Sequence, residues 1–516
     1  MNGTPDRSSG LSRESSIAEV RHRSEPWDFV VVGGGATGVG IALDAASRGY
    51  SVALIEQSDF GKGTSSRSTK LVHGGVRYLA QGNFALVREA LSERALLLQN
   101  APGLVKPLGC VIPAGSAFEA AWYRTGIGLY DFLAGGQVLG ASRWLQGSAV
   151  QAAVPGLRTD SFPAGVLFYD GQFDDARLLI AIARTAAAKG AIQLNYCRAS
   201  RLLLSSGGKV TGVLATDVER GEDYELTARL VINATGAWSD QFRQLADKGP
   251  GQEGANGPGK VRVSRGSHIV ADQKFLPSEN ALLIPKTPDG RVLFAIPWLG
   301  KTLIGTTDVE TENASLDPTA SESEIDFILD TAARYLQLPP QRSDIRSVWA
   351  GIRPLVNAGA KASSGLSREH AIFSDREGLL TITGGKWTTY RRMAEECVDI
   401  AARTAGLAGR PCLTRDLRLD VPAAPKDLEE ATRSGVRNEM ARTVDDILAR
   451  RTRHLFLDAA EAVRLAPSVA GVLAAELGRD EVWCQEQIQS FTALGRLYTV
   501  VGSTEAFHNR SGSLAV

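Results

Sequence analysis

The sequence predicts an α/β fold joined to an α+β fold: a Rossmann-type dinucleotide-binding unit, a unit built on an antiparallel sheet, and a helical C-terminal unit. The first prediction rests on residues 27–56, where an apolar run, a glycine-rich turn, a small-residue helix and a second apolar run follow one another. The second rests on residues 262–307, whose short apolar runs are separated by turns. After Pro411 the pattern is mostly helical.

The glycine-rich turn has the spacing of a pyrophosphate site. Gly33 permits a tight strand-to-helix turn, Gly35 lets the backbone approach a pyrophosphate, and Gly38 lets the helix pack against the strand. The N-terminus of the following helix presents free N–H groups to the phosphates. Glu56 lies 18 residues beyond Gly38, where a carboxylate can accept hydrogen bonds from a ribose. The same glycine spacing recurs at 249–254 without a flanking strand or helix, which indicates a surface loop.

The composition excludes several classes of protein. In 516 residues, 57 Lys and Arg balance 57 Asp and Glu, and this net charge of zero argues against a globally basic nucleic-acid binder. The five cysteines are scattered and never spaced as CxxC, which argues against a disulfide framework, a metal site and a redox-active dithiol. Apolar runs are too short for a bilayer-spanning helix. Residues 1–26 lack an apolar signal core and are expected to form a disordered tail.

Periodicity and turn residues predict the remaining elements. Apolar residues at helical spacing predict a helix over 83–99. Thr443, with Asp446 three positions on, has the pattern of a helix cap, and a domain boundary is expected near 405–420. The other expected elements are a polar loop at 61–75, a helix at 174–189, strands at 191–196, 201–204, 210–217, 230–233 and 378–383, and a helix at 390–404.

Segments in the loops have the composition of a cofactor or phosphate site. Residues 64–78 are too rich in small hydroxyl residues and glycines for a core, and their donors suit a phosphate or the edge of a flavin ring. Residues 233–236 end a strand with small residues, which lets a cofactor approach the backbone. Gly384 and Gly385 fall between a strand and a helix, whose dipole would point at the electron-rich side of a flavin ring.

Several cations and one histidine are candidates for binding an anion. They are Arg77, Arg353, Arg368, Lys386 and His268. Arg353 precedes a proline and Lys386 follows two glycines, and rigid backbone around a cation suits a preorganised anion site. The planar fork of arginine also matches phosphate oxygens. A lone histidine such as His268 is more often a structural hydrogen-bonding residue than a proton acceptor.

Taken together, the order of these segments resembles that of the FAD-dependent, quinone-linked glycerol-3-phosphate dehydrogenase family. The resemblance runs from about residue 28 to 404 and continues more loosely through the C-terminus. Its most specific motifs are SSRSTKLVHGGVRYL (65–79), FDDARL (173–178), GSHIV (266–270), IPWLGKTLIGTTDVE (296–310), GIRPL (351–355) and GGKWTTYR (384–391).

The resemblance implies a fold of the glycine-oxidase and glutathione-reductase-like type. An FAD-dependent oxidoreductase region is expected at 27–404, followed by a helical domain at 405–516. FAD-binding segments are expected at 27–110, 174–245 and 350–404, and substrate-capping segments at 111–173 and 246–349. The residues expected to bind FAD are Gly33, Gly35, Ala36, Thr37, Gly38, Glu56, Thr64, Ser65, Ser66, Ser68, Lys70, Leu71, His73, Gly74, Gly75, Ala234, Thr235, Gly236, Gly385, Lys386 and Thr389.

The resemblance also implies oxidation of sn-glycerol 3-phosphate to dihydroxyacetone phosphate, with electrons passed to a quinone. His268 is expected to take the C2 hydroxyl proton and Arg353 to stabilise the developing charge. The residues expected to bind the substrate are Arg77, Tyr78, Arg353, Arg368 and Lys386. Arg368 is followed by Glu369 and His370, where an acidic and an aromatic residue are also common in the family, so its assignment is the least secure.

Two rival functions stay open. The first is an oxidase of glycerol 3-phosphate or of a small amino acid that uses oxygen, although several cations exceed what one carboxylate needs. The second is an FAD-bearing protein that binds a macromolecular partner, which the neutral charge disfavours. A nicotinamide-dependent disulfide reductase is excluded, because the chain has no CxxC and no second dinucleotide unit.

The expected location is cytoplasmic, with peripheral attachment to the inner face of the cell membrane and no nucleic-acid partner. The segment 117–140 is the candidate contact surface, because aromatic residues such as Trp122 and Phe132 lie beside Arg124. The alternative is that these aromatics belong to a protein core. A homodimer is among the assemblies that we consider.

Overall fold

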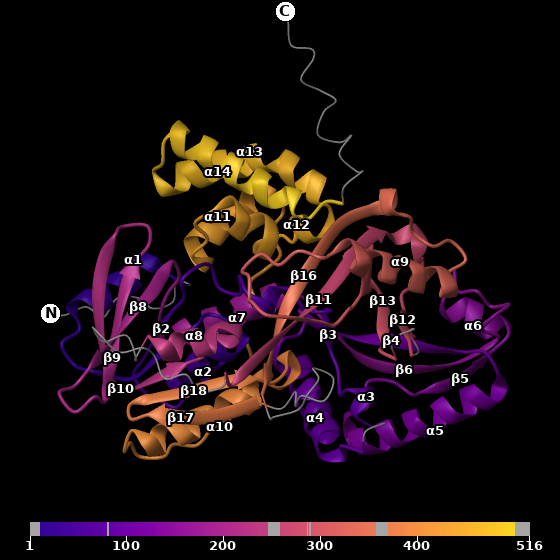
Figure 1. Cartoon of the computed structure of the whole chain (residues 1–516), viewed down its shortest axis with the longest axis horizontal. Helices are drawn as coiled ribbons and strands as arrows, with labels where there is room; N and C mark the ends of the chain where they lie inside the picture. Colours follow the sequence, from indigo (N-terminus) through magenta and orange to yellow (C-terminus); the bar gives the residue numbers. More distant parts are fainter. Residues whose placement is uncertain are drawn as a thin grey trace, which may run out of the picture.

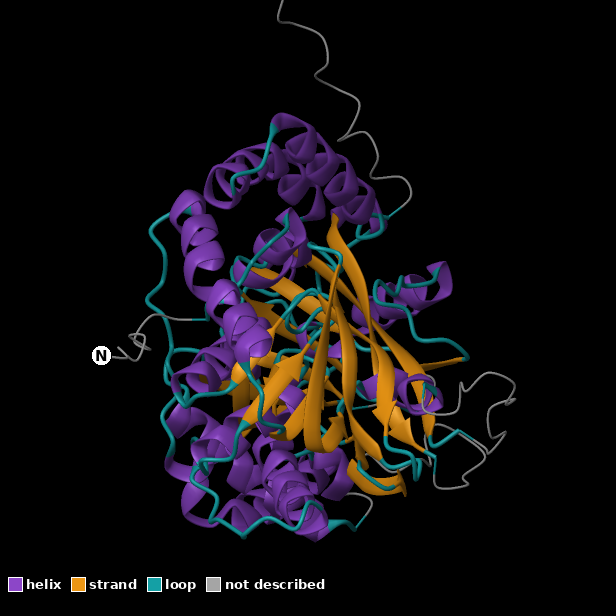
Figure 2. Cartoon of the chain, turned by 90° about the vertical axis from the view of Figure 1, so that its left-hand side faces the viewer, coloured by secondary structure: helices purple, strands orange, loops and turns teal. Residues whose placement is uncertain are grey.

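The computed structural model describes residues 11–79, 82–245, 259–285, 287, 290–357 and 370–500 (Figure 1). The glycine-rich loop predicted at 249–254 lies outside the described residues. Figure 2 shows the strands gathered in the middle of the molecule, with helices around them and at the top. Among the helices that the structure describes, none combines the length and hydropathy that crossing a bilayer requires.

A largely parallel sheet forms the first unit, on the left of Figure 1. Its strand order is β17–β18–β10–β1–β2–β7, and β1 pairs in parallel with both β2 and β10, as a Rossmann-type unit requires. A ribbon of β8 and β9 continues from β10. The strands are β1 (Trp27–Val32), β2 (Val52–Ile55), β7 (Ile192–Leu194), β8 (Cys197–Leu204), β9 (Val210–Asp217), β10 (Glu222–Asn233), β17 (His370–Arg376) and β18 (Leu379–Gly384).

The continuous apolar runs of β1 and β2 are explained by burial on both faces of the sheet. Phe29 and Val31 pack with the helices of one face, and Val30 and Val32 pack with the β8–β9 ribbon on the other. The helices of the first face are α2 (Ala36–Ser47), α7 (Asp175–Ala188) and α10 (Tyr390–Thr404). The predicted βαβ unit is therefore confirmed.

A second sheet, mostly antiparallel, lies beside the first, on the right of Figure 1. Its order is β15–β11–β14–β13–β12–β4–β6–β3, with β16 paired to β11 and β5 to β6. The strands are β3 (Leu71–Val72), β4 (Val105–Ala114), β5 (Arg143–Gln146), β6 (Ala164–Phe173), β11 (Val261–Asp272), β12 (Ala281–Ile284), β13 (Leu293–Trp298), β14 (Lys301–Gly305), β15 (Val309–Thr311) and β16 (Ile345–Val356). The antiparallel texture predicted for 262–307 is confirmed.

Alternate residues of this second sheet face different helices. Cys110 and Ile112 on β4 pack toward α4 (Phe84–Asn100) and α5 (Ala117–Ala134), whereas Val111 packs toward α6 (Ser148–Ala153) and α9 (Glu322–Tyr335). The short strand β3 and much of β16 belong to this sheet, although the sequence assigned them to FAD-binding segments. Segments predicted to bind FAD therefore contribute strands to both sheets.

The C-terminal unit lies above the two sheets in Figure 1, and its apolar residues pack with those of the second sheet. It comprises α11 (Leu428–Glu439), a π-helix η9 (Asp446–Arg451), α12 (His454–Leu457), α13 (Ala459–Leu477) and α14 (Glu481–Arg496). Thr443 and Asp446 make the predicted reciprocal cap: the Asp446 N–H donates to Thr443 Oγ1 (3.2 Å) and the Thr443 N–H to Asp446 Oδ2 (3.1 Å). The domain limits themselves stay a prediction.

The disordered tail predicted for 1–26 is wrong for residues 11–26. Helix α1 (Arg13–His22) buries Ile17 and Val20 against the β8–β9 ribbon. Arg13 donates two hydrogen bonds to Asp217, both of 3.0 Å. The polar sequence of this helix gave no local sign of these distant partners. Residues 1–10 lie outside the described part of the chain.

Candidate active site

A cavity of about 370 Å³ lies where the parallel strands β1, β10 and β18 end. This is the edge of an α/β sheet at which ligands bind. The cavity is lined by the turns that follow these strands, by the end of β2 and by the loop at 61–65. Of the residues predicted to bind the cofactor, its lining includes Gly33, Gly35, Ala36, Thr37, Glu56, Thr64, Ser65, Ala234, Thr235, Gly236, Gly385 and Lys386.

The first turn is shaped so that backbone rather than side chains borders the cavity. Gly33 has φ +115°, and a Cβ there would lie 2.5 Å from the carbonyl oxygen of Ala234. A Cβ on Gly38 would lie 1.9 Å from the carbonyl oxygen of Gly33, so the helix packs closely on the strand. A Cβ on Gly35 would point at Ser65 Oγ, 3.1 Å away, and would narrow the cavity. These positions fit a pyrophosphate at the N-terminus of α2.

Glu56 lies across this turn. Its Oε2 accepts from the Gly34 N–H (2.6 Å) and its Oε1 from the Ser58 N–H (2.9 Å). Burial raises the pKa of Glu56, while these two N–H donors favour the charged carboxylate. Each oxygen retains a lone pair for a further donor such as a ribose hydroxyl.

The loop at 61–75 is hydrogen-bonded to three elements around the site. Thr64 Oγ1 donates to the carbonyl of Ile352 on β16 (2.5 Å), and Ser65 Oγ accepts from the Ala36 N–H on α2 (2.9 Å). The indole N–H of Trp387 donates to the Ser65 carbonyl (2.8 Å). The loop therefore holds the Rossmann turn, the β18 turn and the second sheet in one arrangement.

Other residues of this loop that were predicted to bind the cofactor are not among those that line the cavity. Ser66 Oγ donates to the Gly61 carbonyl, Ser68 and Lys70 both donate to Asp175, and Leu71 is buried in the core. These contacts hold the loop in place, and the predicted role of the four residues in binding FAD stays a prediction. Composition marked the loop as a site but could not tell which side chains face the cavity.

The end of the loop packs against neighbouring helices. The His73 N–H donates to Thr388 Oγ1 (3.2 Å), and the Gly74 N–H donates to the hydroxyl of Tyr130 on α5 (2.8 Å). Gly75 adopts φ +80° where α3 (Val76–Leu79) begins. Thr389 is buried beside the start of α10 and donates to the Lys386 carbonyl (3.3 Å).

His268 lies on β11 of the second sheet with its ring buried. Its Nε2 is 3.0 Å from Thr69 Oγ1, and its ring stacks on Trp349 with centroids 4.1 Å apart. Burial lowers the pKa of His268 well below its usual value, and the charges of Lys70 and Arg353 lower it further. The imidazole is therefore neutral at pH 7 and able to accept a proton.

Arg353 lies on β16 and shares a face of the sheet with His268. Its Nη2 donates to Thr306 Oγ1 (2.8 Å) and the Thr307 carbonyl (3.0 Å), and Nη1 donates to Asp308 (3.2 Å). Its neighbour Pro354 lines the cavity. Sequence reasoning missed Thr306 and Asp308 as partners, although both stand in the quoted motif at 296–310.

Lys386 and Tyr78 are also brought together. The ammonium of Lys386 lies 3.8 Å from the centroid of the Tyr78 ring, a cation–π contact at the edge of the cavity. Arg368 lies outside the described residues, and so does the side chain of Arg77 on α3. The structure thus groups Arg353 and His268 on one sheet face, and Lys386 and Tyr78 at the cavity edge.

Comparison with known proteins identifies the family. The family described as FAD dependent oxidoreductase matches residues 28–391, and the C-terminal domain of alpha-glycerophosphate oxidase matches residues 394–483. The chain is 37% identical to the mitochondrial glycerol-3-phosphate dehydrogenase of Homo sapiens, over 95% of this chain and 76% of that protein. The chain belongs to the FAD-dependent glycerol-3-phosphate dehydrogenase family.

A further relative and two solved structures are also similar to this chain. The mitochondrial enzyme of Arabidopsis thaliana is 41% identical over 79% of this chain and 66% of its own length, so the chain spans about two thirds of that relative. A solved structure of the glycerol-3-phosphate dehydrogenase from Bacillus halodurans complexed with FAD has a TM-score of 0.75 and 29% identity, covering 95% of this chain and 98% of that one. Glycine oxidase from Geobacillus kaustophilus, at 19% identity and TM-score 0.55 over 78% of this chain and all of that one, shares the fold alone. FAD is the cofactor of the family, and the cavity beside Gly33 and Glu56 fits it.

Proposed function

We propose that the protein oxidises sn-glycerol 3-phosphate to dihydroxyacetone phosphate and passes the electrons to a quinone. The observation that carries the proposal is that the buried His268 lies on the same face of β11 and β16 as Arg353, whose charge lowers the pKa of His268, while Pro354, the residue after Arg353, lines the cavity. The printed names of the relatives support the substrate.

The side chains divide the chemistry between them. Bound FAD supplies the acceptor for a hydride, which carries two electrons away from the substrate C2–H bond. His268 accepts the proton of the C2 hydroxyl, and the remaining electron pair of that O–H bond forms the carbonyl. Arg353 stabilises the negative charge that develops on this oxygen. Lys386, with Arg77 and Arg368 of the sequence prediction, attracts the phosphate.

The test is an anaerobic titration of the purified yellow protein. Glycerol 3-phosphate should bleach the flavin absorbance stoichiometrically, whereas glycerol and glycine should leave it unchanged. Bleaching by glycine instead would favour the amino-acid oxidase of the rival prediction. Reoxidation by a soluble quinone should then exceed reoxidation by oxygen, and the reverse order would favour an oxidase.

Peripheral attachment to the inner face of the cell membrane is part of the proposal, with the protein otherwise cytoplasmic. On α5, the large apolar side chains of Phe118, Trp122 and Phe132 are 85%, 73% and 79% exposed, and they recur at helical spacing. Tyr130, on the opposite side of the helix, is buried. An interfacial helix has this division. The alternative, in which the aromatic residues of 117–140 belong to a protein core, therefore applies to Tyr130. It does not apply to the exposed Phe118, Trp122 and Phe132.

Two further points belong to the proposal. We expect the FAD to be held without a covalent bond, so that acid precipitation releases the yellow colour into the supernatant. A homodimer would be detected by sedimentation at micromolar concentration. Colour retained in the pellet would contradict the first point, and a monomeric mass would contradict the second.

A further inference from the structure

Arg453 of the C-terminal unit reaches under the loop that borders the cavity. It lies between η9 and α12 with φ +67°, and its side chain is 1% exposed. Its Nη1 donates to the carbonyl of Ala449 in its own unit (2.8 Å). Its Nη2 donates to the carbonyl of Ser66 (2.9 Å) and to Asp175 Oδ1 (3.0 Å). One guanidinium thus joins the C-terminal unit, the loop and the start of α7.

Asp175 binds the same loop through its second carboxylate oxygen. Its Oδ2 accepts from Lys70 Nζ (2.6 Å), Ser68 Oγ (2.7 Å) and the Ser68 N–H (3.0 Å). Lys70 Nζ also donates to the Ser66 carbonyl (2.9 Å), and Lys70 adopts a left-handed φ of +64°. These contacts fix the backbone of 66–70, and they depend on a carboxylate whose other oxygen is held by Arg453.

This buried group carries a surplus of positive charge. Two cations, Lys70 and Arg453, share the carboxylate of Asp175, and Asp174 Oδ1 lies 3.7 Å from Arg453 Nε. The Lys70 ammonium lies 4.7 Å from the Trp349 ring centroid and 5.4 Å from that of Phe456, and Arg453 lies 4.4 Å from the Phe456 centroid. Aromatic faces attract cations, so the rings offset part of the surplus positive charge. Trp349 is also the ring on which His268 stacks.

Thr69 connects this group to the proton acceptor. It stands between the two anchored residues Ser68 and Lys70, and its hydroxyl is 3.0 Å from His268 Nε2. The direction of that hydroxyl is therefore set by the backbone that Asp175 holds. We propose that Arg453 is a positioning residue for His268, acting through Asp175 and Thr69; this inference rests on the proposed function.

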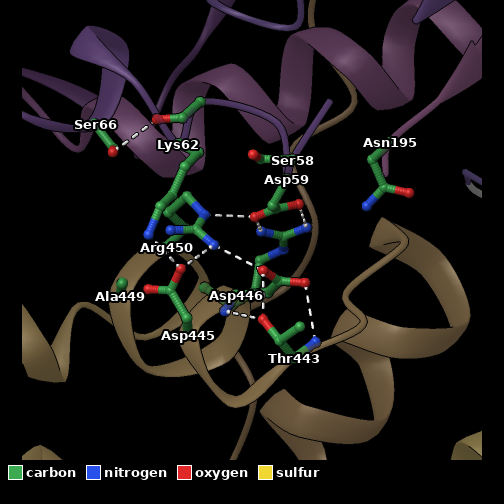
Figure 3. A network of polar contacts seen from close by, with 12 residues as sticks. Ser58, Asp59, Lys62, Ser66, Asn195, Thr443, Asp445, Asp446, Ala449 and Arg450 are labelled. Carbon is green, nitrogen blue, oxygen red and sulfur yellow. Dashed lines mark hydrogen bonds and ion pairs between the residues drawn. The ribbon is translucent and has the colours of Figure 1, made fainter. Parts of the chain in front are cut away.

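Two other residues of the C-terminal unit bind a part of the chain that precedes Ser66. Figure 3 shows Arg450 and Asp445 reaching Asp59 and Lys62: Arg450 Nε donates to Asp59 Oδ2 (2.5 Å), and Lys62 Nζ donates to Asp445 Oδ2 (2.9 Å). These pairs hold residues 59–62, on the cofactor side of the loop, whereas Arg453 holds Ser66 and the Asp175 carboxylate that anchors Ser68 and Lys70 on either side of Thr69. The structure therefore assigns the alignment of His268 to Arg453 specifically.

The test substitutes Arg453→Lys, because full removal would leave the buried carbonyls of Ala449 and Ser66 and Asp175 Oδ1 without this donor. Lysine keeps the charge but cannot hold Ala449, Ser66 and Asp175 together. The matched control is Arg437→Lys in the same unit, where an exposed arginine pairs with Glu476. Each purified holoenzyme is assayed for FAD content, thermal midpoint, KM and kcat with glycerol 3-phosphate.

We expect Arg453→Lys to lower kcat roughly 10- to 100-fold, as a misaligned catalytic group does, with KM and FAD content close to wild type. Thr69→Val should lower kcat similarly, and the double variant should be no slower than Thr69→Val alone. If the losses of kcat in the two single variants multiply in the double variant, the two residues act independently and the proposal is overturned. A kcat for Arg453→Lys equal to that of Arg437→Lys would overturn it as well. A wild type that glycerol 3-phosphate does not reduce would instead overturn the proposed function.

Discussion

The guanidinium of Arg353 occupies the space above Gly266, so that a Cβ at position 266 would lie 2.1 Å from Arg353 Nη2. His268 stands two residues further along the same strand and therefore projects from the same face. Opposite it, a Cβ on Gly305 would lie 2.3 Å from His268 Cδ2. Two glycines thus make room for the two residues to which we assign proton transfer and charge stabilisation.

Gly266→Ala should displace Arg353 while leaving the cofactor cavity intact. We expect kcat/KM with glycerol 3-phosphate to fall about 10- to 100-fold, because a charge-assisted hydrogen bond contributes about 1.5–3 kcal/mol. FAD content should stay normal. Gly471→Ala, a helical glycine with no neighbour within 4 Å of its Cβ, is the control and should leave kcat/KM unchanged. Equal activity of the two variants would remove Arg353 from the reacting end of the site.

Arg353→Lys separates the charge of this residue from its geometry. The variant keeps a cation but loses the fork that reaches Thr306 and Asp308. We expect the activity measured in steady-state kinetics to fall sharply. The FAD absorbance of the purified variant should stay normal. Wild-type kinetics in this variant would show that only the charge of Arg353 matters.

The pH profile reports the protonation of His268. Its pKa lies well below 6.5, because burial and the charges of Lys70 and Arg353 disfavour imidazolium. The neutral form that accepts a proton is therefore present at and below pH 6.5, and kcat/KM should decline only at distinctly lower pH. His268→Asn should lower kcat by roughly 10²–10⁴ and abolish this acid limb. An inflection near pH 6.5 in the wild type would contradict the assignment.

Gly35→Val should block the cofactor. The added side chain would project into the space beside Ser65 Oγ, at the start of α2, where both residues line the cavity. We expect a colourless protein with a lower thermal midpoint, since FAD stabilises the state that binds it. Absorbance at the flavin maximum relative to protein measures the occupancy. A yellow variant with full occupancy would place the pyrophosphate elsewhere.

Membrane attachment should depend on the outer face of α5. Trp122→Glu should reduce co-sedimentation with anionic vesicles severalfold, because burial of this 73% exposed ring is replaced by burial of a charge. Val482→Glu changes an exposed apolar residue on α14 and should not alter binding. If both variants bind vesicles like the wild type, another surface makes the contact.

The fold was predictable where its signals are local. The turn at Gly33, the helix after Phe84 and the Thr443 cap each depend on neighbouring residues, and each was found. Helix α1 was missed because its docking depends on Arg13 and Asp217, which are 204 residues apart. The ion pair of Lys70 was not predicted for the same reason: its partner Asp175 lies 105 residues away. Long-range ion pairs leave no periodic pattern in a sequence.

The order of strands in the Rossmann sheet has a consequence for how the protein is made. Strand β1 ends at Val32, yet its neighbour β10 ends at Asn233, and β10 in turn pairs with β18, which ends at Gly384. At a translation rate of roughly 5–20 residues per second, β1 leaves the ribosome on the order of 10–40 s before β10 has been synthesised. During this interval its apolar edge is open to wrong partners. Nascent chains of this protein should therefore depend on chaperones until synthesis has passed β10.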